Sequence, residues 1–473
     1  MKKLFNISIL AALGLSVTMT SCLKAEEDNI FDQNAVDRLE QAKVDYANIL
    51  TDKGGKWAVD YFANPDEPGY VYIMTFKKDG TVVMSGDNKW INKLDPGAEY
   101  TSKPKFRTES SMWQMVGDNG PVLSFNTYNP IFHLFADPND IAPDQDPSTW
   151  PNGVDPSPDE TGHGHKGDYE FDIMKHSGDS LYMLGKKHEL SIVMHRIPAD
   201  TDDKQYFDSI ASMLESTNIT KFPELMLRGA DGENYTVKDI STQIITFYPK
   251  DVSWIDRVAM TVSGNAIATL DGFRFVTPVK LVNSKKGNTL TVQRFKLQED
   301  GSFLCLDDGV SRITCLPYAS IFSDLENNRW KSKAEGWGGV IKTLGETVLT
   351  QLKTLPARAR PNFFNIEFLY DNVKKQYIFR IAGHKVENDI IGNADFYIKK
   401  PVMIDDTHVK FEFTGESNVS GSTYLKKAPD IQKILDFVAN NTFVLSSKSA
   451  LNPSRLKLAS DANAEDYINL DVQ

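Results

Sequence analysis

The stretch Tyr70–Met84, YVYIMTFKKDGTVVM, decides which fold we expect for this chain. Its two runs are rich in Tyr, Val, Ile and Thr, residues that favour extended strands. The turn dipeptide Asp79-Gly80 separates the runs and favours a tight reversal of the chain. The stretch therefore predicts an antiparallel β-hairpin.

Similar short runs fill the sequence from Trp57 to Ile197, separated by Asp-Gly, Asn-Gly and Gly-Asp turns. They predict an antiparallel meander, and a sheet of this many strands is expected to curl into a barrel or sandwich. Strand patterns resume in YTVKDISTQIITFYP, NTLTVQRFKL and GSFLCL, and again in FFNIEFLYDNVKKQYIFRIAG and HVKFEFTG. The expected class is mainly β with a few helices (α+β), with curled antiparallel sheets each preceded by a helix.

Apolar residues at helical spacing mark the few expected helices. The first runs from Val36 to Leu50 and ends at the TDKGG turn, and the second covers Ala199–Thr217 with acidic residues at its start. Near-helical spacing returns between Val340 and Leu352. A last helix is expected from Ile431 to Val438, after Pro429.

The opening helix region has a partial echo later in the chain. YANILTDKGGKW ends at Trp57, and YASIFSDLENNRW ends at Trp330. The echo is short, so a duplicated helix-plus-sheet unit is a hypothesis. The expected organisation is a lipoprotein signal peptide (1–21), an acidic tether (22–33), a helix-plus-β domain (34–198), a linking helix (199–218), a second β region (219–320) and a C-terminal β-rich region with a terminal helix (321–473).

The N-terminus reads MKKLFNISILAALGLSVTMTSC, a positive start followed by an apolar stretch too short for a permanent bilayer span. Met19-Thr20-Ser21-Cys22 fits a lipoprotein signal peptidase, which needs small residues before the cysteine that accepts the lipid. We expect lipidation of Cys22 and attachment to a membrane. The alternative is an ordinary signal peptide that contains a cysteine.

The chain carries 52 basic and 64 acidic side chains, and removal of Lys2 and Lys3 with the signal leaves 50 against 64, a net charge of −14. Such a charge repels nucleic acid, which is excluded as a partner. The acidic run Glu26-Glu27-Asp28 follows the expected anchor. It is either a solvated tether or a signal for export to the outer face of the outer membrane.

Cys305 and Cys315 are the other two cysteines, and they flank a turn dipeptide, Asp308-Gly309. Neighbouring strands can place two thiols opposite each other, so a disulfide is one interpretation in an oxidising compartment. The alternative is two buried free thiols. No histidine stands near them to suggest zinc.

A metal site has two weak candidates, and no resident cofactor is otherwise expected. His163 and His165 lie two residues apart among carboxylates and offer ligands to a transition metal. The aspartates of DPNDIAPDQDP, from Asp137, offer oxygens to calcium, but the EF-hand spacing fails. Both lie in a Gly- and Pro-rich segment, where a solvated loop is the simpler interpretation.

Tryptophans that border loops are candidates for holding sugars or peptides, since aromatic rings stack on both. These are Trp90, Trp113, Trp150 and Trp337. Trp57 and Trp330 follow the two related helix segments and are expected in the core.

No catalytic motif emerges from the sequence. The pairs Asp307-Asp308 and Asp405-Asp406 contain the acids that a glycosidase needs, but they occupy turn positions where Asp is favoured for backbone hydrogen bonds. No G-x-S-x-G elbow, P-loop or HExxH helix is present. The sequence favours a non-enzymatic protein, with a hydrolase of undescribed type as the alternative.

Four stretches together resemble a family of Bacteroidota lipoproteins of unknown function, DUF4302. They are RLEQAKVDYANILTDKGGKW, GPVLSFNTYNPIFHLFADP, GDYEFDIM and LGKKHELSIVMHRI. The resemblance implies an accessory lipoprotein encoded beside TonB-dependent transporters and their SusD-like partners. It therefore implies capture of a nutrient, such as a glycan or peptide, at the cell surface. It supplies no catalytic residues, and the His163 segment departs from the family's shorter glycine-rich turn.

Overall fold

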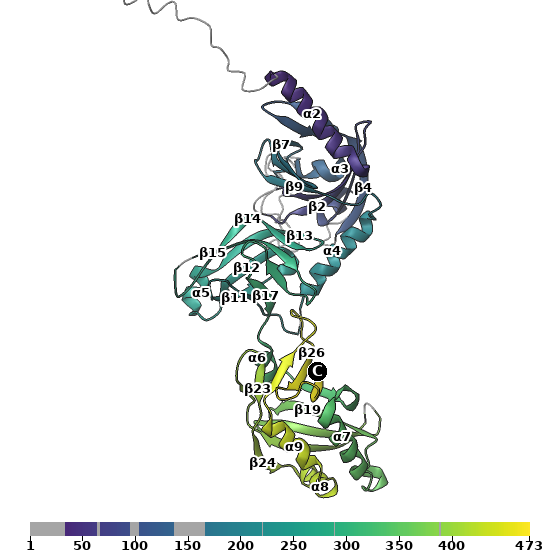
Figure 1. Ribbon diagram of the computed structural model, residues 1–473, viewed down its shortest axis with the longest axis vertical. Coiled ribbons are helices and arrows are strands. Elements are labelled where there is room, and N and C mark those ends of the chain that lie inside the picture. Colours follow the sequence, from purple (N-terminus) through teal and green to yellow (C-terminus); the bar gives the residue numbers. More distant parts are fainter. Residues whose placement is uncertain are drawn as a thin grey trace, which may run out of the picture.

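The computed structural model describes residues 34–63, 67–94, 104–136, 166–219, 221–287, 289–386 and 389–473. These residues form three β units stacked along the long axis of the molecule (Figure 1): an N-terminal sheet, a closed barrel and a C-terminal sheet. The strand pairings among the described residues are antiparallel in all three units. The expected fold class, mainly β with curled antiparallel sheets and a few helices, is confirmed.

The N-terminal unit begins with helix α2 (Ala35–Thr51), as the apolar spacing predicted. The side chain of Asn34 accepts a hydrogen bond from the backbone N of Asp37 and so caps the first turn. The short helix η1 (Asp52–Gly54) follows, and Gly55 then turns the chain with a φ of 65°. A side chain at Gly55 would meet the carbonyl oxygen of Phe76 at 2.2 Å, so glycine is required there.

The first sheet has nine strands in the order β4-β3-β2-β1-β9-β8-β7-β6-β5. The expected meander is present, but its last strand returns to pair with its first. Only Trp113 separates β4 from β5, the two edge strands, so the sheet must curl until its edges approach each other. The elements are β1 (Lys56–Tyr61), β2 (Tyr70–Phe76), β3 (Thr81–Asn88), η2 (Lys89–Leu94), β4 (Lys105–Met112), β5 (Gln114–Gly117), β6 (Pro121–Ser124), α3 (Pro130–His133), η3 (Leu134–Ala136), β7 (Glu170–Ser177), β8 (Ser180–Gly185) and β9 (Ser191–Arg196).

Helix α4 (Asp203–Thr217) connects this sheet to the barrel and lies beside both (Figure 1). Asp202 caps it by accepting from the backbone N of Gln205. The eight barrel strands follow the chain order and close by pairing of the first with the last. The elements are β10 (Leu225–Arg228), β11 (Asn234–Lys238), η6 (Ile240–Thr242), β12 (Ile244–Pro249), α5 (Trp254–Met260), β13 (Val262–Thr269), β14 (Gly272–Val282), β15 (Thr289–Leu297), β16 (Phe303–Cys305) and β17 (Arg312–Cys315).

The C-terminal sheet has ten strands in the order β22-β23-β25-β26-β27-β18-β19-β20-β21-β24. Helices α7 and α9 carry the apolar residues expected at helical spacing, and they pack against each other. The elements are α6 (Tyr318–Ser323), β18 (Trp330–Lys333), η7 (Ala334–Gly336), α7 (Gly339–Leu352), η8 (Ala357–Ala359), β19 (Phe363–Asp371), β20 (Gln376–His384), β21 (Ile390–Ile398), β22 (Val402–Met403), β23 (His408–Lys410), β24 (Phe413–Ser417), α8 (Val419–Lys427), α9 (Ile431–Asn440), β25 (Phe443–Ser446), β26 (Arg455–Ser460) and β27 (Tyr467–Val472).

The two sheets share a plan around their first strand. β1 lies between β2 and the last strand of its unit, β9, and β18 lies between β19 and the last strand of its unit, β27. Trp57 on β1 and Trp330 on β18 are both fully buried, as their positions after the related segments led us to expect. This likeness of topology supports the hypothesis of a partial repeat, which stays a prediction.

The three units are packed together through apolar side chains. Phe62 and Ile73 of the first sheet belong to the same buried cluster as Ile267 of the barrel. At the other end of the barrel, Phe222 stacks on Trp330 with ring centroids 6.1 Å apart. The junctions are therefore continuous with the core.

A candidate binding cleft between the first sheet and the barrel

A cleft of about 410 Å³ lies at the junction of the first sheet and the barrel. One wall comes from β1, β8 and β9, and the other from the β13–β14 turn, strands β14 and β15 and Leu306 just after β16. Helix α4 contributes one side chain. Ligand sites favour such junctions, and this volume suits a small molecule. The lining residues are Asp60, Tyr182, Val193, His195, Tyr206, Thr269, Leu270, Asp271, Phe273, Arg274, Arg294, Phe295, Lys296 and Leu306.

Alternation along β1 explains why Asp60 faces the cleft. Successive strand residues point to opposite faces of a sheet. Trp57, Val59 and Tyr61 enter the core inside the first sheet. Asp60 lies on the opposite face, with Phe62, which packs toward the barrel.

Asp60 joins the two units through an ion pair. Its Oδ2 accepts hydrogen bonds from Nη2 and Nε of Arg274 at 3.1 and 3.2 Å. The two side chains are only 5% and 15% exposed. The Arg274 guanidinium also lies 5.1 Å from the centre of the Phe62 ring, so one arginine makes a charged and an aromatic contact across the junction.

The rest of the cleft combines exposed apolar surface with hydrogen-bond donors. Tyr182, Leu270 and Leu306 are 39%, 44% and 44% exposed at its rim. Lys296 is exposed and has no ion-pair partner among the described residues. Burial raises the pKa of the Tyr206 phenol, and Asp60 and Asp271 raise it further, so this hydroxyl remains a neutral donor at physiological pH.

Ser180, His195 and Asp60 form a sequence of contacts that invites comparison with a catalytic triad. Ser180 Oγ lies 3.0 Å from His195 Nδ1, but His195 Nε2 lies 3.9 Å from Asp60 Oδ2. A triad needs a hydrogen bond at both steps. Ser180 and His195 are direct cross-strand partners on β8 and β9, and Arg274 already engages Asp60. The arrangement suits binding better than nucleophilic catalysis.

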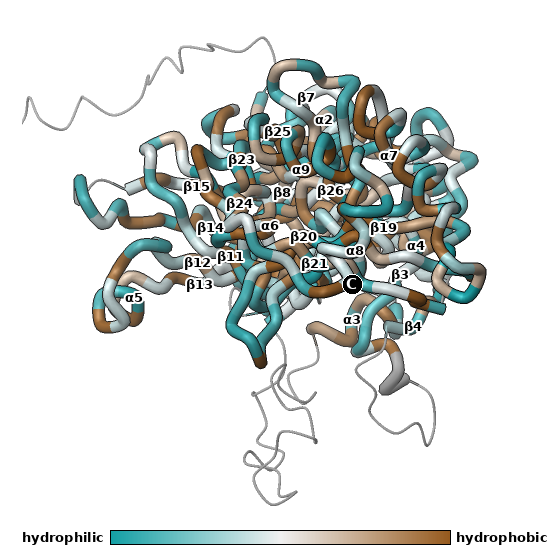
Figure 2. The backbone as a smooth tube through the Cα atoms, turned by 90° about the horizontal axis from the view of Figure 1, so that it is seen from below, coloured by the Kyte–Doolittle hydropathy of each residue, from teal (hydrophilic) through white to brown (hydrophobic). Residues whose placement is uncertain are grey.

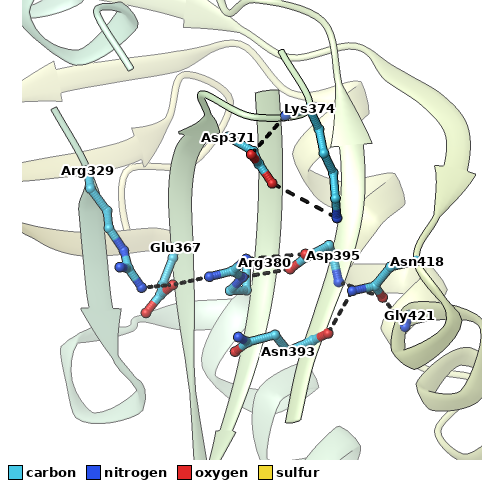
Figure 3. A network of polar contacts seen from close by, with 9 residues as sticks. All are labelled: Arg329, Glu367, Asp371, Lys374, Arg380, Asn393, Asp395, Asn418 and Gly421. Atoms are coloured by element: carbon cyan, nitrogen blue, oxygen red, sulfur yellow. Dashed lines mark hydrogen bonds and ion pairs between the residues drawn. The ribbon is translucent and has the colours of Figure 1, made fainter. Parts of the chain in front are cut away.

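A second polar cluster lies on the C-terminal sheet, where Figure 3 shows Arg380 between the carboxylates of Glu367 and Asp395. Arg329 donates to Glu367 from the other side at 2.6 Å. Glu367, Arg380 and Asp395 face one another because they are paired in register across β19, β20 and β21. Both carboxylates are held by guanidinium groups, so they do not form the acid and base pair that a glycosidase uses.

Three tryptophans that we expected at the surface are core residues, which corrects that interpretation. Trp90 is 0% exposed, Trp113 8% and Trp337 3%. Their indole N–H groups donate to the hydroxyl of Tyr70, to the Lys77 carbonyl and to Ser332. Proximity to a loop in the sequence does not decide which face of a strand a side chain occupies.

Of the two interpretations of the cysteine pair, the structure shows the buried free thiols and not the disulfide. Cys305 and Cys315 are free and buried on neighbouring strands β16 and β17. The backbone N of Cys305 bonds the carbonyl of Ser311, whereas Cys315 pairs with Leu225 on β10. The hairpin is present, but its register offsets the thiols, and each fills the barrel interior.

The remaining candidate residues cannot be placed in the structure. Cys22, Trp150, His163, His165 and the aspartates of residues 137–147 lie outside the described residues. Within the residues that are described, no group of three or more His, Cys, Asp or Glu side chains has metal-binding geometry. In the same part of the chain, no helix combines the length and apolarity needed to cross a bilayer.

One acid of each turn pair serves its local backbone, whereas Asp307 pairs with Arg294 and Asp406 with Arg228. Asp308 accepts from the backbone N of Val310 and Ser311, and Asp405 accepts from the backbone N of Thr407 and His408. The backbone hydrogen bonds expected of these turn aspartates are present. The sequence reasoning missed Asp60, although a carboxylate inside the apolar run WAVDYF was a visible signal.

The fold and cleft define a β-rich protein with a ligand-sized cavity between two packed units. The chain belongs to the family described as "Domain of unknown function (DUF4302)", which it matches over residues 27–294, more than half its length. That segment contains both walls of the cleft as far as Arg294. No curated protein matches the chain.

Two solved structures with a remote likeness to the chain illustrate the structural comparison. Transferrin binding protein B (isotype 1) from serogroup B Neisseria meningitidis is 10% identical, with 88% of this chain and 75% of that chain covered, at a TM-score of 0.14. The DNA polymerase β subunit of Streptococcus pyogenes is 7% identical, with 91% and 97% covered, at a TM-score of 0.13. TM-scores this low support no argument about fold or function.

Proposed function

We propose that this protein is a non-enzymatic lipoprotein of the bacterial outer surface that binds a short glycan or peptide in the cleft between the first sheet and the barrel. The observation that carries the proposal is the composition of the cleft. The exposed Tyr182 lines one wall, and Lys296 and Arg294, which also pairs with Asp307, line the other, together with the neutral hydroxyl of Tyr206. Sugars and peptides both present apolar faces beside polar groups, which this combination recognises.

The place of the protein in the cell rests on its sequence and family. Cys22 would carry the lipid, and the acidic residues behind it would direct the protein to the exterior of the outer membrane. The family resemblance implies a role beside a TonB-dependent transporter and a SusD-like protein, either presenting a nutrient or serving as an accessory subunit, and we include that role in the proposal. No metal or cofactor is part of the proposal.

The ligand is tested with the mature chain and a panel of oligosaccharides and short peptides, by calorimetry or NMR titration. Tyr182→Ala is expected to weaken binding about tenfold, because stacking on an aromatic ring contributes roughly 1–2 kcal/mol. Tyr128→Ala is the matched control, since Tyr128 is 68% exposed outside the cleft. Equal affinities for the two variants would place the ligand elsewhere.

The anchor and the partner need separate tests. Radiolabelled palmitate should enter the wild-type protein and not Cys22→Ser, and a surface protease should digest the protein on intact cells. Crosslinking in membranes should recover a transporter or SusD-like protein. Recovery of the chain alone would count against the accessory role while leaving ligand binding open to its own test.

The alternative function, hydrolysis, is favoured by one contact, that of Ser180 with His195 at 3.0 Å. Its test is release of reducing sugar or free amine from the same panel. Turnover that disappears in Ser180→Ala and in His195→Ala would replace the binding proposal. Turnover absent from the wild type would remove the alternative. Turnover unchanged in both variants would place hydrolysis at another site and would contradict a non-enzymatic protein.

A further inference from the structure

Helix α5 presents its apolar residues to solvent. Trp254 is 70% exposed, Ile255 74% and Val258 60%, and no residue of the helix is buried. Figure 2 shows α5 at the periphery of the molecule, with hydrophobic stretches away from the packed centre. Contiguous exposed apolar side chains on a soluble protein usually mark a surface that meets another apolar surface.

The position of these residues on the helix explains why they form one patch. At about 100° per residue, Trp254, Ile255 and Val258 share one side of α5. The same kind of spacing in α9 places Ile431 and Ile434 in the core, where both are 0% exposed. In α5 the corresponding apolar side is exposed to solvent, and no other side of the helix is buried.

Cations gather beside the patch, in a chain with excess acid. Lys238, Lys250 and Arg257 line a pocket of about 540 Å³ next to α5, and none of them has an ion pair with another described residue. The Lys238 and Arg257 charges lie 5.7 and 5.4 Å from the ring centre of Tyr248. Glu224 and Asp239 also line the pocket, which leaves a net positive charge from its five charged side chains.

Size and shape narrow the choice of occupant. The three side chains expose roughly 300–400 Å² of mainly apolar surface, against about 800 Å² per partner in a standard protein interface. A second copy of the chain is thus a poor match for the patch alone. A lipid surface needs no complementary groove, and its phosphates are natural partners for the neighbouring cations.

We propose that α5 is a membrane-contact site, in which Trp254, Ile255 and Val258 enter the interfacial layer of the bilayer and Arg257 and Lys250 reach lipid phosphates. The contact would fix the orientation of a protein that is already tethered through Cys22. The orienting role rests on the proposed anchor. The lipid contact itself does not, and it is tested without the anchor.

The experiment uses the mature chain, residues 22–473 with Cys22→Ser, which contains every described residue. It is floated with vesicles of phosphatidylcholine alone and of phosphatidylcholine with one-fifth phosphatidylglycerol. We expect the chain to float with both kinds of vesicle and to bind more tightly to those that contain phosphatidylglycerol. The double variant Trp254→Ser/Val258→Ser should partition into vesicles about tenfold more weakly. Indole emission should shift to shorter wavelength on binding in the parent and not in Trp254→Phe, because the other described tryptophans are buried.

Val373→Ser with Val419→Ser is the matched control, since these valines are 92% and 85% exposed on the C-terminal unit. This control should float like the parent. The double variant Lys250→Gln/Arg257→Gln should lose the preference for phosphatidylglycerol. Absence of flotation by the parent, or equal loss in the control, would overturn the proposal. If the parent binds no vesicles and sedimentation shows an oligomer that the α5 substitutions dissociate, the proposal is overturned in favour of self-association.

Discussion

Asp60 and Arg274 are separated by 214 positions in the chain, yet their charged groups meet at 3.1 Å across the junction of the first sheet and the barrel. Both residues line the candidate cleft, and their contact joins its two walls. Because both side chains are nearly buried, neither charge is well solvated if the other is removed. The same ion pair therefore stabilises the junction and positions two residues that line the cleft.

Asp60→Asn is expected to lower the free energy of unfolding by about 2–4 kcal/mol, because it leaves the Arg274 guanidinium largely desolvated without a counter-charge. Urea unfolding measures the change. Arg455→Ala is the control: Arg455 also pairs with an aspartate but is 70% exposed, so it should cost about 0.5 kcal/mol or less. Equal losses in the two variants would show that the interdomain pair contributes little.

A row of alternating charges crosses the C-terminal sheet in direct register. It comprises Arg455, Asp471, Lys331, Glu367, Arg380 and Asp395. Glu367, at 0% exposed, is the most deeply buried member. Opposite charges directly across strands stabilise a sheet, and like charges there destabilise it.

Glu367→Gln should lower the free energy of unfolding by about 3–5 kcal/mol, since Arg329 and Arg380 would then face each other without their shared carboxylate. A double-mutant cycle with Arg380→Met separates this pair from its surroundings. The double variant should lose less than the sum of the two single losses, although Asp395 then also lacks its guanidinium partner. A strictly additive double variant would contradict the coupling that the register implies.

The sequence predicted the elements better than it predicted their long-range partners. Helical spacing placed α2, α4 and α9 because the period of apolar residues is a local property. The return of β9 to β1 and the closure of β17 on β10 join residues more than a hundred and about ninety positions apart, and no local pattern specifies such pairings. No local pattern specifies the strand register that separates Cys305 from Cys315 either.

The candidate site was hidden from the sequence for a related reason. Tyr182 and Arg274 lie on different units and line one cleft only because those units pack together. Neither residue belongs to a local sequence motif. Trp90, Trp113 and Trp337 border loops in the sequence but point inward. Trp254 is the exposed one among the described tryptophans, and its spacing with Ile255 and Val258 is the pattern that normally predicts a buried helix face.

The thiols of the barrel should be free and unreactive in the folded protein. Burial raises the pKa of Cys305 to about 11 and that of Cys315 to about 12, so at pH 8 both are protonated and inaccessible. In the Cys22→Ser chain, iodoacetamide should label neither cysteine before unfolding and both after it, without added reductant. Mass spectrometry gives the count, and a disulfide or rapid native labelling would contradict the offset register.

His384 should make the stability of the C-terminal sheet depend on pH. Its ring is 0% exposed, stacks on Phe363 at 5.2 Å and has Nδ1 without a partner, and burial lowers its pKa, with Lys331 adding to the effect. The folded state therefore resists protonation, while the unfolded chain takes up the proton near pH 6.5. The stability that neutral His384 provides is present above about pH 6.5 and is lost as pH falls below it, by at most about 1.4 kcal/mol per pH unit.

Urea unfolding at pH 7.5, 6.5 and 5.5 measures this slope, and His384→Gln, which stays neutral, should reduce it. The variant loses some stability at every pH through altered packing, so only the change with pH reports on protonation. His176→Gln is the matched control, because His176 is exposed and should leave the slope unchanged. His133, whose pKa burial also lowers, remains in both variants and accounts for part of the residual slope. Parallel pH dependences for wild type and His384→Gln would mean that His384 is protonated as readily in the folded protein as in the unfolded chain.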